Sequence, residues 1–132
     1  MNLKNFDKYK QVEKVWGREI WLTNTQAYCA KFLEIQPGFH CSLHCHKLKH
    51  ETFFVLEGTA QIKVIYPNGY NEERVYIPGD HLALEPGTYH RFQSVNSSPV
   101  LLLEVSTQHS DSDVQRLVDS GPILSSNKDN PW

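Results

Sequence analysis

Apolar residues in this chain recur at every second position or in short runs, and turn-forming residues separate these segments. The pattern predicts β-strands, because successive side chains of a strand point to opposite faces of a sheet. The segments follow one another at intervals of about ten residues, which is the rhythm of β-sandwiches and double-sheet jelly rolls. The expected strands are residues 15–22, 28–35, 41–46, 52–56, 60–66, 74–77, 81–84, 90–95 and 100–107.

The segment after the last expected strand has a different spacing. Ser110 or Asp111 is a suitable N-cap for a helix, and Gly121-Pro122 would end it. The apolar residues between them would share one helical face: Val114, Leu117 and Val118. We therefore expect an all-β domain at 15–109, an N-terminal arm at 1–14, and a short C-terminal helix with a tail at 110–132.

The composition of the 132 residues is that of an ordinary single globular domain, with 39% hydrophobic and 21% charged residues. The net charge of −2 gives no basic surplus for nucleic acid, and no apolar run is long enough for a membrane span. The first residues are polar rather than a signal peptide, so we expect a cytoplasmic location. Three cysteines disfavour a disulfide framework and predict buried thiols: Cys29, Cys41 and Cys45.

One short stretch, HCHKLKHE, gathers three histidines and a glutamate. His44 and His46 are two residues apart on an expected strand, so their side chains point the same way. Glu51 begins the next strand, and two imidazoles with a carboxylate leave coordination positions open on a divalent metal. His90, which follows a Pro-Gly turn into another strand, is the natural fourth ligand.

These residues resemble the two motifs of the cupin superfamily. The first motif has its full spacing, with the three ligands between two glycines: Gly38, His44, His46, Glu51 and Gly58. Gly79 and the PGTYH stretch ending at His90 resemble the second motif, although Glu85 and Ser94 depart from it. The resemblance implies a jelly-roll β-barrel that binds one divalent transition metal (Mn, Fe, Zn, Ni or Co) through His44, His46, Glu51 and His90.

A narrower resemblance links the chain to the cupin domain of type II mannose-6-phosphate isomerases. It rests on the stretches WGREIW, YCAKFLEIQPG, ETFFVLEG, PGTYHR and LEVST, followed by DVQR. Two departures matter: those enzymes commonly carry Gln at the position of His44, and Pro122 stands where their signature ends in an arginine. Losing that arginine makes a neutral sugar as plausible a substrate as a phosphorylated one.

The resemblance implies an aldose–ketose isomerase or epimerase acting on a sugar or sugar phosphate. Either Glu104, a lone carboxylate inside VLLLEV, or Lys31, on its strand, is expected to move the proton, and Arg91 is expected to hold an anionic group. Two alternatives remain open. The same ligands suit an iron-dependent dioxygenase, and a cupin can also be a non-catalytic sugar- or metabolite-binding module.

A homodimer is expected as well. The resemblance suggests it, and the N-terminal part is rich in aromatic residues of the kind that often cover a partner: Phe6, Tyr9, Trp16 and Trp21. Packing of these residues on the chain's own barrel is the alternative.

Overall fold

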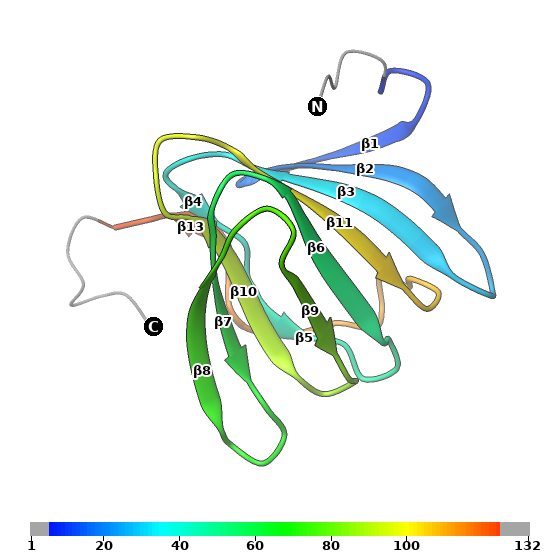
Figure 1. Ribbon diagram of the computed structural model, residues 1–132. Coiled ribbons are helices and arrows are strands. Elements are labelled where there is room, and N and C mark those ends of the chain that lie inside the picture. Colours follow the sequence, from blue (N-terminus) through cyan, green and yellow to red (C-terminus); the bar gives the residue numbers. More distant parts are fainter. Residues whose placement is uncertain (1–5, 125–132) are drawn as a thin grey trace.

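The computed structural model describes residues 6–124, and this part of the chain contains thirteen strands and no helix. The strands are β1 Lys10–Lys14, β2 Gly17–Asn24, β3 Cys29–Ile35, β4 Phe39–His40, β5 Leu43–Cys45, β6 Glu51–Glu57, β7 Ala60–Ile65, β8 Asn71–Tyr76, β9 His81–Leu84, β10 Tyr89–Ser94, β11 Val100–Ser106, β12 Gln115–Val118 and β13 Gly121–Pro122. They form two antiparallel sheets that lie as two layers (Figure 1).

The first sheet has the order β1-β2-β3-β11-β6-β9. Its register aligns a row of side chains across five strands, because residues paired in an antiparallel ladder share a face. That row runs from β1 at one edge of the sheet to β6: Lys10, Trp21, Lys31, Glu104 and Phe53. The lysine and the glutamate that the sequence singled out are therefore cross-strand neighbours on one face.

The second sheet is built around β10, which pairs with β7 along its whole length. The other edge of β10 meets one interrupted strand, with Gln93 opposite His40 on β4 and His90 opposite His44 on β5. Strand β12 pairs with β5, and strand β13 pairs with β4. This arrangement puts His44 and His90 side by side.

The apolar core fills the space between the sheets. Phe53 from the first sheet meets Phe92 from the second edge to face, with ring centroids 4.6 Å apart. The cluster continues through Leu33, Ile35, Val55, Ile62, Val64, Val100 and Leu102, all buried. Each such side chain contributes about 1.5–3 kcal/mol on full burial. The core therefore holds the two sheets together and leaves the polar residues at its open end.

Most sequence-based expectations for the fold are confirmed. All nine expected strands are present with small shifts of their ends, and the Asn68-Gly69 turn joins β7 to β8 with Gly69 at φ +88°. The three cysteines are free and buried. In the described part of the chain, no helix has the length and apolar character needed to cross a bilayer.

Two expectations are wrong. The C-terminal helix is absent, and residues Gln115–Val118 instead form β12, because pairing with the edge of β5 satisfies their backbone groups. Leu117 on the supposed apolar face is exposed. The barrel is also not closed, since no strand pairing among residues 6–124 joins the two sheets.

Part of the expected N-terminal arm forms a strand. Residues 10–14 of that arm form β1 and pair with β2 along their whole length. Residues 1–5 of the arm and residues 125–132 of the expected tail lie outside the described residues.

Candidate metal centre

Four side chains predicted from the sequence as metal ligands converge at the open end of the core. His44 lies on β5, His46 directly follows it, Glu51 begins β6, and His90 lies on β10. Ligand nitrogens of the three histidines all lie within 4.8 Å of one another. The two oxygens of Glu51 face this group, with Oε1 3.4 Å from His46 Nε2 and Oε2 3.4 Å from His90 Nε2.

Each histidine ring is held by its Nδ1 atom against a backbone carbonyl. The distances are 2.9 Å from His44 to Ser42 O, 2.5 Å from His46 to Asp113 O, and 3.1 Å from His90 to Thr88 O. A carbonyl only accepts hydrogen bonds, so Nδ1 carries the proton in all three rings. The Nε2 lone pairs are then left to face the centre, as in most histidine metal ligands.

The electrostatics of the site favour the neutral ligand form of the three histidines. Burial lowers the pKa of His90 to about 3, and it also lowers the pKa of His44 and of His46. The rings are therefore neutral at neutral pH. Burial, followed by the charge of Glu104, raises the pKa of Glu51 to about 8, against the opposing effect of Lys49.

One atom shows directly that the residues suit a metal. His90 Nε2 is fully buried and accepts no hydrogen bond from any described residue. An unsatisfied buried acceptor costs free energy, and a cation among three Nε2 atoms and a carboxylate would remove this cost. The donor set of three imidazoles and one carboxylate fits a divalent transition metal such as Mn, Fe, Co, Ni or Zn.

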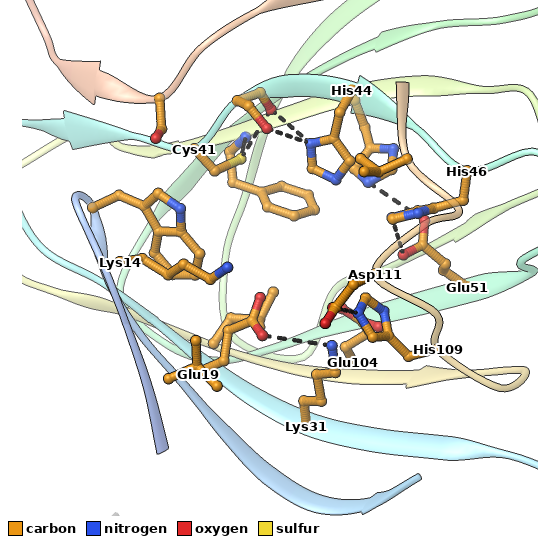
Figure 2. Close-up of a pocket in the computed structure, with 18 of the residues that line it drawn as sticks. Lys14, Glu19, Lys31, Cys41, His44, His46, Glu51, Glu104, His109 and Asp111 are labelled. Atoms are coloured by element: carbon orange, nitrogen blue, oxygen red, sulfur yellow. Dashed lines mark hydrogen bonds and ion pairs between the residues drawn. The ribbon is translucent and has the colours of Figure 1, made fainter. Parts of the chain in front are cut away.

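The facing wall of the pocket carries the predicted proton-moving residues and one that the sequence analysis missed. Lys49 Nζ lies 2.8 Å from Glu104 Oε2 and 3.6 Å from Glu51 Oε1. Lys31 Nζ lies 3.5 Å from Glu19 Oε1 and 4.1 Å from the centroid of the Trp21 ring. Figure 2 shows Lys31, Glu104 and His109 across the pocket from His44.

The charges in this wall stabilise one another. Burial alone would raise the pKa of Glu104, but Lys49 and Lys31 outweigh it and lower that pKa below its ordinary value. Burial likewise opposes the charged form of Lys49, yet Glu104 and Glu51 raise its pKa. Both groups are therefore ionised at neutral pH, as a buried ammonium–carboxylate pair.

The ligands and this wall enclose a cavity of about 710 Å³. Its floor is apolar, with Leu33, Phe53 and Phe92, and its other walls carry Trp16, Trp21, Lys14 and Arg116. The structure does not bring Arg91 to this cavity. His90 and Phe92 line it, and Arg91 between them points to the other side of β10, where its Nη2 donates to Gln93 Oε1 at 3.1 Å.

The sequence analysis did not predict Lys49 or His109 as residues of the site. Lys49 lies two residues before Glu51, and that spacing places two side chains on the same side of an extended segment. His109 is 60 residues from Lys49, and its Nδ1 lies 3.0 Å from Lys49 Nζ. No spacing signal in the sequence connects His109 with the ligands.

Two antiparallel sheets with three histidines and one carboxylate gathered between them define a jelly roll with a candidate metal site. The family model described as Cupin domain matches residues 31–106, so the chain belongs to the cupins. No curated protein matches the chain.

Among solved structures, oxalate decarboxylase from Bacillus subtilis at pH 4.6 is similar, with a TM-score of 0.76 and 18% identity over 85% of this chain. A structure of the same enzyme concerned with its Mn(II) centres has a TM-score of 0.72 and 19% identity over 82% of this chain. The chain spans 31% and 30% of these two structures, respectively. At such identity the likeness shows the fold alone.

Proposed function

We propose that this cupin is a metal-dependent isomerase that interconverts an aldose and a ketose, or epimerises a related sugar. The observation that carries the proposal is the buried Lys49–Glu104 pair beside the candidate metal ligands. A proton-transfer enzyme needs a base and an acid within reach of two neighbouring carbons of its substrate. The resemblance to type II mannose-6-phosphate isomerases supports the same reaction.

The chain's residues suit the individual steps. Glu104 is ionised, so its carboxylate is able to take a proton from the carbon beside a carbonyl and return it to the neighbouring carbon. Lys49 holds Glu104 in place, and its ammonium group is able to stabilise or protonate a substrate oxygen. A bound divalent metal supplies Lewis-acid polarisation of the carbonyl. The reaction needs no oxidant. One proton moves from a carbon to its neighbour, and another moves from the hydroxyl oxygen to the former carbonyl oxygen.

The cavity supports a sugar as the substrate class. Its apolar floor and the Trp16 and Trp21 rings suit the C–H faces of a pyranose or an open-chain sugar, and the polar walls suit hydroxyl groups. Lys14 and Arg116 also line the cavity, so a carboxylate or phosphate at one end of the sugar is compatible with it.

The proposal is tested by incubating metal-loaded protein with aldoses, ketoses and their phosphates in deuterated solvent. We expect one substrate to exchange a carbon-bound proton and to convert into its isomer. Tight binding of a sugar without exchange would replace the proposal with a non-catalytic binding module. Oxygen uptake in the presence of iron would replace it with a dioxygenase.

A further inference from the structure

Residues 107–114, here called the strap, connect β11 of the first sheet to β12 of the second sheet. Three residues of the strap line the cavity wall: His109, Asp111 and Val114. Figure 2 shows His109 and Asp111 beside Glu104 and facing His46. The first residues of the expected helix therefore lie against the candidate metal centre.

Asp113 on the strap makes two kinds of contact with the ligand segment. Its backbone oxygen accepts the hydrogen bond from His46 Nδ1 at 2.5 Å. Its carboxylate accepts hydrogen bonds from the next two backbone amides, Lys47 N at 2.8 Å and Leu48 N at 3.2 Å. One residue thus holds both the ring of a candidate ligand and the turn that follows it.

The strap is anchored independently at its other end. The backbone amide of His109 donates to Asn24 Oδ1 at 2.9 Å, and Asn24 Nδ2 donates to the His109 carbonyl at 3.1 Å. The Thr107 amide donates to the His50 carbonyl at 3.0 Å. Because these contacts do not involve Asp113, the strap stays attached to the first sheet when the Asp113 side chain is removed.

We propose that Asp113 is a positioning residue of the metal centre, which acts through His46. The Asp113 carboxylate fixes the 46–48 turn relative to the strap. The Asp113 carbonyl is thereby held opposite His46 Nδ1. That contact determines which nitrogen of His46 carries the proton and where Nε2 points. Without the carboxylate, the Asp113 carbonyl is no longer held in a fixed position relative to the His46 ring. His46 then no longer presents Nε2 in one orientation. This inference rests on the metal site of the proposed function, but it does not depend on the isomerase reaction.

The expected effect is on metal affinity. Loss of a partner that orients a histidine ligand typically weakens metal binding by about 10–100-fold. Asp113→Ala should lie in that range. Asp113→Asn retains an acceptor oxygen for the Lys47 and Leu48 amides, so we expect it to stay within about threefold of the parent protein. Ser112→Ala is the matched control, since Ser112 is exposed on the same strap and its hydroxyl contacts only Ser110 Oγ among the described side chains.

The experiment measures Co²⁺ and Zn²⁺ affinity by competition with a chromophoric chelator, together with the visible spectrum of the Co²⁺ protein. The thermal midpoint of the metal-free variants controls for folding. A weaker affinity and an altered Co²⁺ spectrum in Asp113→Ala, with Ser112→Ala unchanged, would support the inference. Parent-like affinity in folded Asp113→Ala would overturn it. If Asp113→Ala does not fold, Asp113→Ser replaces it. Weaker affinity in Asp113→Ser would then support the inference, and parent-like affinity would overturn it. A parent protein that binds no metal would refute the metal site itself, which is a different result.

Discussion

The Nζ atom of Lys49 lies 2.8 Å from Oε2 of Glu104, and both side chains are buried. Because the same ammonium lies 3.6 Å from Glu51, one lysine connects the candidate metal ligands to the carboxylate expected to move the proton. A buried ion pair is weak evidence for stability, since desolvation of both charges opposes their attraction. Its position beside an open cavity favours a functional role, and the first prediction tests that role.

Glu104→Gln should slow turnover of the sugar substrate by about 10²–10⁴-fold, which is the usual contribution of a general acid–base group. The amide keeps the shape of the side chain but neither accepts a proton nor carries the charge that Lys49 faces. Steady-state kinetics with the substrate found in the exchange screen measure the effect. Metal content serves as the control and should equal that of the parent, since Glu104 is not among the candidate ligands. Parent-like turnover in Glu104→Gln would remove this residue from the mechanism.

Metal binding should release a proton from Glu51 at pH 7. In the metal-free protein the pKa of Glu51 is about 8, so its carboxyl group is mostly protonated at pH 7, whereas coordination requires the carboxylate. The apparent metal affinity should therefore rise with pH up to about 8 and then level off. The three histidines add little to this dependence near neutrality, because their lowered pKa values keep them neutral.

Calorimetric titration in buffers with different ionisation enthalpies measures the number of protons released. Glu51→Gln should bind metal more weakly and should release no proton from this position. Equal proton release in the parent and in Glu51→Gln would show that the proton comes from another group.

Gly58→Ala should destabilise the fold more than Gly69→Ala. Both glycines have positive φ, at +79° and +88°, so either alanine has to adopt a left-handed conformation that costs about 1–2 kcal/mol. A Cβ on Gly58 would also collide with the backbone oxygen of Pro99, whereas nothing lies within 4 Å of a Cβ on Gly69. We expect about 1–3 kcal/mol more for Gly58→Ala because of this overpacking. Urea unfolding midpoints of the two variants measure the difference, and equal midpoints would contradict the collision.

The homodimer expected from the sequence stays a prediction, but part of its reasoning changes. Phe6 stacks on Phe32 of the chain's own sheet with ring centroids 5.1 Å apart, and Trp16 is buried in the core. Trp21 lines the cavity. These aromatic residues have partners within the chain, so the dimer now rests on the family resemblance. Light scattering at micromolar concentration should give twice the mass of one chain, and a monomer mass would refute the dimer.

The strands and the ligands could be predicted from the sequence because their signals are local. Alternation of apolar residues identifies a strand without knowledge of its neighbours, and the spacing of His44, His46 and Glu51 encodes which side chains share a face. His90 was inferred from the Pro-Gly turn that leads into its strand, and then from its fit to the second motif. In the structure His90 on β10 lies opposite His44 on β5. A motif spacing can therefore identify two residues on distant strands that lie together, although the strand pairing itself is not visible in the sequence.

The path of the strap and the position of Lys49 could not be predicted in the same way. Val114, Leu117 and Val118 have helical spacing, yet pairing with β5 overrides it, and a single sequence does not reveal that pairing. In the sequence, nothing distinguishes Lys49 from an ordinary loop lysine. Its partner Glu104 is 55 residues further along the chain, and only the structure places the two charged groups 2.8 Å apart. Arg91 was chosen for its charge next to His90, but adjacent residues of a strand point to opposite faces.

The metal content of protein purified without chelator tests the four-ligand centre most directly. Elemental analysis of the parent protein and of His46→Ala, prepared in parallel, gives the number of transition-metal ions per chain. We predict close to one divalent ion per chain in the parent and a large loss in His46→Ala. A His46→Ala protein that retains the metal content of the parent would contradict the assignment of His44, His46, Glu51 and His90 as the metal centre.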